Sequence, residues 1–156
     1  LDDQKKFESL KYWIGVWEAN GAKIDGINAK LSLYYSEDEA QQADNKAKID
    51  MLIDNLVSTG KLIRLSNFDI KYQDASGVNV TAKDITEEQR QKLADYYAYI
   101  IKSYMNKVPS EKQAGLCKGN MVDTSDPVGL WAKDASSGDW VRTATYKAFC
   151  DALSGN

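Results

Sequence analysis

The stretch Lys61-Leu-Ile-Arg-Leu-Ser-Asn-Phe-Asp69 decides the fold of this chain. Its alternation of apolar and polar residues predicts a β-strand over residues 62–70, with Asn67 and Asp69 near its end. Because side chains alternate between the two faces of a strand, we expect Asn67 and Asp69 to share a face with Ile63 and Leu65. The strand is therefore predicted to end in a polar pair.

Helices and strands alternate on both sides of this strand. Helices are predicted over residues 3–20, 36–59 and 86–107, followed by a closing helix marked by Tyr146, Phe149 and Leu153. Further strands are predicted over residues 24–35 and 114–122. Strands that are separated by long helices imply a parallel sheet with right-handed crossovers. The expected fold class is α/β, a single domain over residues 1–156 with three parallel strands and flanking helices.

Two of the predicted helices begin with a specific capping signal. Ser36 with Glu39, and Thr86 with Gln89, match the pattern in which a hydroxyl and a Glu or Gln side chain cap the first turn. No repeat, low-complexity segment or linker divides the chain.

Composition excludes several classes of function. The 156 residues carry a net charge of −3, so a basic surface for nucleic acid is not expected. No apolar run approaches the ~20 residues of a membrane span, and the polar start of the sequence does not resemble a signal peptide. The absence of histidine excludes Ser-His-Asp triads, Cys-His dyads and most zinc sites. We predict no cofactor and no metal.

The sequence contains two cysteines, Cys117 and Cys150, which are too few and too far apart for a metal cluster. Two small buried thiols are the first interpretation, and a disulfide is the alternative. Spacing in the sequence does not test the geometry of a bridge, so the choice stays open.

Several stretches of the chain resemble family 10 glycoside hydrolases, the retaining endo-xylanases, and their gut-bacterial members in particular. The matching stretches, in chain order, are residues 12–27, 61–69, 86–101, 114–123, 127–131 and 145–153. They are similar to the approach to the sixth barrel strand, the seventh strand, the helix after it, the eighth strand, the closing loop and the last helix. The resemblance therefore implies a half barrel, the carboxyl-terminal part of a (β/α)8 barrel.

The resemblance also implies that the chemistry of the family's active site has been lost. The family's seventh strand reads Ser-Glu-Leu-Asp with the glutamate as nucleophile, and Asn67 takes that position here. The sixth strand's Gln-Met-His corresponds to Lys30, Leu31 and Ser32, and the eighth strand's sugar-stacking Trp corresponds to Gly119. A retaining glycosidase needs two carboxyl groups about 5–5.5 Å apart. Since the family's acid/base glutamate belongs to the fourth strand, the resemblance implies no catalytic residue in this chain.

Candidate ligand-binding residues gather at or after the predicted strand ends, where barrel folds build their sites. Sugars bind on exposed aromatic faces that are rimmed by polar groups. The candidates are Lys30, Ser32, Tyr34, Asn67, Asp69, Trp131 and Trp140, with Tyr35 and Tyr72 as further aromatics. Tyr34 and Tyr35 have an alternative role in packing on the following helix. Trp131 could instead plug the core, and Trp140 could anchor the predicted loop over residues 123–143.

Other residues are assigned structural roles. Trp13 and Trp17 lie on the first predicted helix and are expected in the core. Asp123 ends the third predicted strand and is expected to cap the loop that follows. Glu37 and Glu39 lie in a first helical turn, where a favourable dipole interaction is expected and not a catalytic pair.

Three functions stay open. The first is a non-catalytic relative of xylan-degrading enzymes that acts as a carbohydrate-associated, glycan-binding domain. The second is the carboxyl-terminal part of a glycoside hydrolase whose catalytic half lies outside this chain. The third is a structural or interaction module that has lost sugar contact. The resemblance implies a plant polysaccharide such as xylan as partner, and a secreted, cell-surface or periplasmic location.

Three strands from a closed barrel imply an uncovered inner face and two unpaired sheet edges. We expect Leu31, Leu33, Ile63 and Leu65 to line that face. Because large apolar faces rarely stay in contact with water, self-association or a missing half-barrel partner is expected to cover it. Folding of the 123–143 loop over the face is the alternative.

Overall fold

The computed structural model describes residues 3–155, so the first two residues and the last residue of the predicted domain lie outside the described residues. The elements in chain order are α1 (Gln4–Ala19), β1 (Gly26–Ser36), α2 (Glu39–Val57), β2 (Leu62–Gln73), β3 (Asn79–Val80), α3 (Glu87–Lys107), the 3-10 turn η1 (Ser110–Lys112), β4 (Gln113–Leu116), β5 (Trp131–Lys133), β6 (Trp140–Arg142) and α4 (Ala144–Ser154). The predicted order of helices and principal strands is observed, and β3, β5 and β6 are additional short strands.

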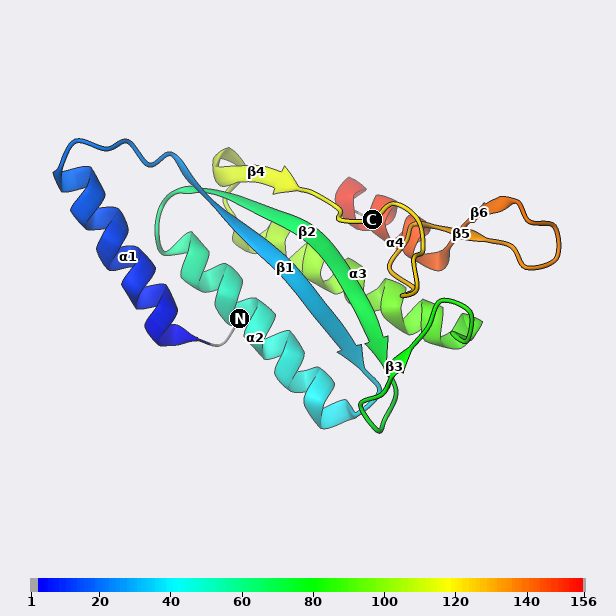
Figure 1. Ribbon diagram of the computed structural model, residues 1–156. Helices are drawn as coiled ribbons and strands as arrows, with labels where there is room; N and C mark the ends of the chain where they lie inside the picture. The colour runs from blue at the N-terminus through cyan, green and yellow to red at the C-terminus, as the bar shows by residue number, and fades with distance from the viewer. Residues whose placement is uncertain (1–2, 156) are drawn as a thin grey trace.

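Strand β2 is the centre of the main sheet (Figure 1). It pairs in parallel with β1 on one side and with the shorter β4 on the other. The two-residue strand β3 lies antiparallel to the end of β2, and β5 and β6 form a separate antiparallel hairpin. The α/β fold class, with a sheet that contains parallel strands, is therefore confirmed.

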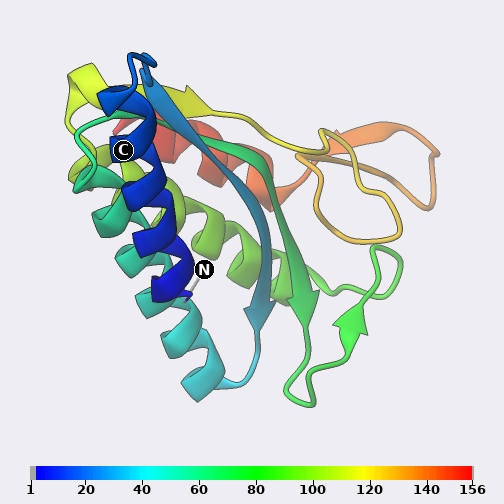
Figure 2. The same ribbon diagram turned by 60° about the vertical axis from the view of Figure 1, so that its left-hand side comes forward.

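The helices cover one face of this sheet and leave the other face open (Figures 1 and 2). Helices α2 and α3 pack against β1 and β2, and α4 packs against α3. The core between the sheet and the helices contains side chains that are at most 5% exposed: Leu31, Leu33, Ile49, Ile53, Leu56, Ile63, Leu65, Phe68, Ile70, Leu93, Tyr97 and Ile100. Burial of this apolar surface is the main stabilising contribution to the fold.

A β-bulge at Asn67 changes the alternation of side chains along β2. The pairing of β1 with β2 shifts between Lys30 and Ser32, so that two residues of β2 oppose one residue of β1. Asn67 has a φ of 51°, in the left-handed region that Asn visits more readily than most residues. Leu65 before the bulge and Phe68 after it are therefore both buried on the helix-covered face.

The expectation that Leu31, Leu33, Ile63 and Leu65 line an uncovered inner face is wrong. All four are buried in the core beneath the helices, and the bulge also separates Asp69 from the face that carries Ile63 and Leu65. The exposed side chains of β1 belong to the alternate residues, on the other face of the strand: Asn28, Lys30, Ser32 and Tyr34. Because the open face is mainly polar, the physical reason for self-association across it does not hold.

The two predicted capping signals have different outcomes. The Thr86 hydroxyl accepts from the Gln89 backbone N–H at 3.2 Å, and the Gln89 side chain accepts from the Thr86 N–H at 3.0 Å, which confirms that capping box. The Ser36 capping box is wrong, because Ser36 ends β1. Asp38 caps α2 by accepting from the Gln41 N–H at 2.7 Å. Asp and Ser are comparable N-caps, so the sequence pattern did not distinguish them.

The third principal strand is shorter than predicted. It ends at Leu116 and not at residue 122. The Cys117 backbone still donates to the Leu65 carbonyl oxygen at 2.8 Å and accepts from the Phe68 N–H at 3.0 Å. Gly115 has a φ of 105°, a conformation open mainly to glycine. Beyond Cys117 the chain leaves the strand conformation.

Helix α1 lies at the edge of the fold with its aromatic side chains exposed. The prediction that Trp13 and Trp17 are core residues is wrong, because they are 47% and 46% exposed. Their rings stack on each other with centroids 6.3 Å apart, and Ile14 is the buried residue of this helix. In Figures 1 and 2, α1 has α2 and β1 on one side and no described element on the other.

The cysteines do not form a bridge. Both are free thiols, with Cys117 half-buried and Cys150 exposed. The interpretation as two buried thiols is therefore wrong for Cys150, which lies in α4.

Candidate ligand-binding site at the strand ends

The parallel register brings several predicted site residues together toward the carboxyl ends of β1 and β2. Ser32 pairs with Asp69 across the two strands. Asn67 lies at the adjacent bulge, and its side-chain amide donates to the Leu31 carbonyl oxygen at 3.3 Å. The amide at the nucleophile-like position is thus bonded to the neighbouring strand.

Asp69 is enclosed by the segment that follows β4. Its carboxylate accepts from the Asn120 backbone N–H at 3.0 Å and from the Asn120 side-chain amide at 2.6 Å, and it pairs with the ammonium of Lys118. That ammonium also donates to the Tyr97 hydroxyl at 3.1 Å and lies 5.0 Å from the centre of the Tyr97 ring. The hydrogen-bonding capacity of Asp69 is therefore used within the chain.

Lys118 is a nearly buried cation. Its side chain is 5% exposed. The loss of hydration lowers the pKa of Lys118, and the hydrogen bond and negative charge of Asp69 act in the opposite direction. Removing one partner of such a pair leaves an uncompensated charge, which is strongly destabilising. The Asp69–Lys118 pair therefore has a structural role near the carboxyl end of β2.

Gly119 lies where Asp69 leaves no room for a side chain. A Cβ atom at this position would be 2.7 Å from the Cγ atom of Asp69. In the resemblance to xylanases this is the position of a sugar-stacking tryptophan. Such a side chain is incompatible with the observed placement of Asp69.

Asp123 has the loop-holding role expected of it. Its carboxylate accepts from the Gly129 backbone N–H at 2.8 Å, across the loop that it begins. It also pairs with Arg90 at 2.7 Å between Nη2 and Oδ2, and both side chains are largely buried. Arg90 donates in addition to the Ala82 carbonyl oxygen at 3.3 Å. This carboxylate therefore attaches the loop to α3.

Two further carboxylates near these strand ends are also engaged. Glu37 accepts from the Tyr72 hydroxyl at 2.7 Å, and burial together with this hydrogen bond raises the pKa of Tyr72. Asp126 pairs with Lys71 at 2.9 Å, and that hydrogen bond raises the pKa of Lys71. Among the described residues at the strand ends we find no pair of unengaged carboxylates.

Lys30, Ser32 and Tyr34 form a row on the open face of β1. They are alternate residues of one strand, so their Cα atoms are roughly 6.6 Å apart from one to the next. All three are exposed, Tyr34 to 39%. Tyr35 and Tyr72 are not exposed aromatics: Tyr72 is buried, Tyr35 is half-buried, and their rings stack at 4.9 Å. Of the predicted strand-end tyrosines, Tyr34 alone offers an exposed face.

Trp131 and Trp140 lie on the β5–β6 hairpin, which extends away from the main sheet (Figure 1). Trp131 is half-buried, with its ring edge-on to Tyr146 at 5.6 Å and the guanidinium of Arg142 at 5.4 Å. Trp140 is 54% exposed. The structure does not join these residues to the row on β1, and Trp140 is the one of the two that is available to a ligand.

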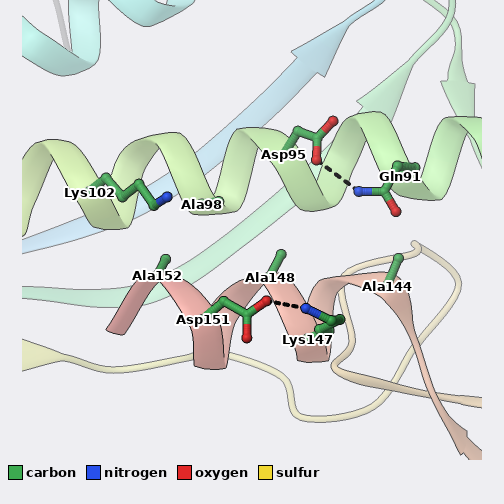
Figure 3. A pocket seen from close by; sticks show the side chains of 9 residues that line it. All are labelled: Gln91, Asp95, Ala98, Lys102, Ala144, Lys147, Ala148, Asp151 and Ala152. Carbon is green, nitrogen blue, oxygen red and sulfur yellow. Dashed lines mark hydrogen bonds and ion pairs between the residues drawn. The ribbon is translucent and has the colours of Figure 1, made fainter. Parts of the chain in front are cut away.

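A separate hollow of about 270 Å³ lies between α3 and α4 (Figure 3). Alanines of both helices line it, together with charged side chains. Gln91 donates to Asp95 at 2.8 Å, and Lys147 pairs with Asp151, so each pair is satisfied within its own helix. Because its polar groups are mostly paired and it is formed by helices alone, we assign it no binding role.

Sequence reasoning missed the residues that bind the Asp69 carboxylate, namely Lys118 and Asn120. A lysine after a strand ordinarily indicates a solvated position, and no local pattern in the sequence distinguishes a buried one. The glycine between them was the available signal, because it marks a close approach of another group.

No helix within residues 3–155 is long and apolar enough to cross a membrane. Within the same residues, no group of three or more Cys, Asp or Glu side chains is arranged to hold a metal ion.

The described α/β fold is similar to part of the fold of family 10 xylanases. A mutant of xylanase 10C from Cellvibrio japonicus in complex with xylopentaose matches 97% of this chain and 31% of its own length, with a TM-score of 0.74 and 17% identity. A thermostable mutant of Xyn10A from the same organism matches 98% and 46%, with a TM-score of 0.74 and 16% identity. A GH10 endoxylanase from a sugarcane soil metagenome matches 92% and 44%, with a TM-score of 0.66 and 14% identity.

These comparisons show that the chain has the fold of a portion of GH10 xylanases, as the sequence resemblance indicated. The chain spans between 31% and 46% of the length of the three solved chains described. No protein-family model matches the sequence, and no curated protein matches it.

Proposed function

We propose that this chain is a non-catalytic relative of xylan-degrading glycoside hydrolases that acts as a glycan-binding domain. The observation that carries the proposal is that the polar groups near the carboxyl end of β2 are bonded to other groups of the chain. Asn67 supplies an amide where a retaining glycosidase needs a carboxylate, and Asp69 is bound by Lys118. Exposed Tyr34 and Trp140 leave aromatic faces for sugar rings. A plant polysaccharide of the xylan type is the proposed ligand, at a secreted, periplasmic or cell-surface location.

We further propose that β1, β2 and β4 are three neighbouring strands of a half barrel, from the carboxyl-terminal part of a (β/α)8 barrel. Their parallel pairing around β2 supports this arrangement. The chain's 31–46% share of the solved xylanase chains supports it as well. That share also favours a second candidate function, in which the chain is the carboxyl-terminal part of a hydrolase whose catalytic half lies outside it.

The proposed loss of chemistry is tested by incubating the purified chain with xylan. We expect no release of reducing sugar above the blank, with C. japonicus Xyn10A as the positive control. The Asn67→Glu variant should also be inactive, because one carboxylate cannot supply both the nucleophile and the acid/base group. Sugar release by the unmodified chain would overturn the non-catalytic assignment.

The proposed binding is tested on a glycan array that includes xylans. We expect retention on xylan-type glycans, and about 2- to 10-fold weaker binding after Trp140→Ala or Tyr34→Ala, since each removes one stacking face. Trp13→Ala is the matched control, because Trp13 is also an exposed aromatic but lies on a different element, α1. Absence of binding to every glycan would favour a structural or interaction module.

A further inference from the structure

The open face of the sheet carries two basic residues that have no acidic partner. Lys30 on β1 and Arg64 on β2 are both exposed, and neither has an ion pair within residues 3–155. Other cations on or near the same strands are paired, Lys71 with Asp126 and Lys118 with Asp69. The positive charge of this part of the face is therefore not neutralised within the described chain.

The register places these two cations close together. Asn28 pairs with Arg64, and Lys30 pairs with Ser66. Lys30 and Arg64 are thus diagonal neighbours across two adjacent strands, roughly 8 Å apart at their Cα atoms by ordinary sheet dimensions. Their flexible side chains can converge on one group above the sheet.

Groups that suit a sugar lie beside the cations. Ser32 and Tyr34 follow Lys30 along the same exposed row of β1, and Ser66 faces Lys30 across the strands. Hydroxyls supply hydrogen-bond donors and acceptors for sugar hydroxyls, and the exposed Tyr34 ring supplies an apolar face. An acidic polypeptide would also bind the cations, but it has less need of the hydroxyls and the aromatic ring beside them.

We propose that the open face binds a polysaccharide that carries carboxylate groups, that is, one substituted with uronic acids. Arg64 and Lys30 bind the carboxylate, and Ser32, Ser66 and Tyr34 contact the adjoining sugar units. Arg forms paired hydrogen bonds with a carboxylate, and charge-assisted hydrogen bonds are stronger than neutral ones. This inference rests on the proposed glycan-binding function and specifies the chemical class of its ligand.

The test compares glucuronoxylan with unsubstituted xylan in affinity gel electrophoresis of the purified chain. We expect stronger retardation by glucuronoxylan, decreasing as salt screens the charges. The variant with Lys30→Gln and Arg64→Gln should bind glucuronoxylan about tenfold or more weakly, as expected when hydrogen bonds to a charged group are removed. Its binding to unsubstituted xylan should weaken much less, because that glycan carries no carboxylate for the two cations.

A control variant with Lys102→Gln and Lys147→Gln removes the same charge from the α3–α4 hollow and should behave as the unmodified chain. Lys30 and Arg64 are exposed, so both variants should fold, which circular dichroism verifies. Polyglutamate is included as a competitor to separate a glycan from an acidic polypeptide.

Equal binding of both xylans, unaffected by the Lys30 and Arg64 substitutions, would overturn this inference and leave the glycan-binding proposal standing. Binding of neither xylan would overturn both. Displacement of glucuronoxylan by polyglutamate of the same charge at equal or lower concentration would assign the face to an acidic polypeptide, and so would also overturn the inference.

Discussion

The two faces of the main sheet are made by the same strands and have opposite character. On the helix-covered face, Leu31, Leu65 and Phe68 are at most 1% exposed. On the open face, Lys30 and Arg64 are exposed and carry charge. The difference shows that most of the apolar residues of these strands pack against the helices. What remains is a mainly polar surface, which does not favour a hydrophobic interface.

The bulge at Asn67 makes this separation possible. Without the extra residue, strict alternation would place Leu65 and Phe68 on opposite faces. With it, the apolar set stays in the core along the whole of β2. Asp69 then lies on the other face of β2 from Phe68 and pairs with Lys118, whose ammonium also contacts the core residue Tyr97.

Removal of a large side chain from the covered face should have the largest effect on stability. Phe68→Ala should lower the free energy of unfolding by about 3–5 kcal/mol, through lost burial and the cavity left behind. Ser66→Ala, on the open side of the same strand, should change it by less than about 0.5 kcal/mol. Urea denaturation of both variants measures the contrast. Equal losses would mean that the two faces are not energetically distinct.

Disruption of the Asp69–Lys118 pair should have the second largest effect on stability. Lys118→Met should lower the free energy of unfolding by about 3 kcal/mol, because it leaves the Asp69 carboxylate without its cation. Adding Asp69→Asn to Lys118→Met should restore part of the loss, since no uncompensated charge then remains. Denaturation curves of the two single variants and the double variant give the coupling. Additive losses would contradict a structural ion pair.

Gly119→Ala should have a smaller effect of about 1–3 kcal/mol, because its Cβ would lie 2.7 Å from the Cγ atom of Asp69 and force a displacement. The same substitution in an Asp69→Ala background should cost much less, since the obstructing carboxylate is gone. The measurement is again the free energy of unfolding. A cost that is independent of Asp69 would mean that backbone conformation, and not this contact, requires glycine.

The smallest expected effect concerns pH. Burial, aided by the hydrogen bond to Asp50, raises the pKa of Tyr99 on the helix side to about 12. The folded chain then holds a proton that the unfolded chain loses above pH ~10. This contribution to stability is complete below pH ~10 and is lost as pH rises toward 12. Tyr99→Phe should make the alkaline decline less steep in denaturation curves at pH 9 to 12; an unchanged slope would refute the assignment.

The sequence by itself determined where the principal elements lie and which residue types they carry. Apolar periodicity located the principal helices and strands, and the Thr86 capping box, which involves residues three apart in the chain, formed as predicted. The amide at Asn67 and the absence of histidine are visible without coordinates. These properties are local or compositional, so they do not require knowledge of the neighbouring strands.

The tertiary structure alone decided which face each strand residue occupies. The bulge depends on the pairing of β1 with β2, whose contacting residues Leu31 and Asn67 are 36 residues apart in the chain. One extra residue in β2 reverses the face on which each later side chain of that strand lies. The exposure of Trp13 and Trp17 likewise depends on what packs beside α1. Lys118 is buried because it has Asp69, 49 residues away in the chain, as a partner. Contacts between residues distant in sequence set burial and charge pairing, which local patterns do not encode.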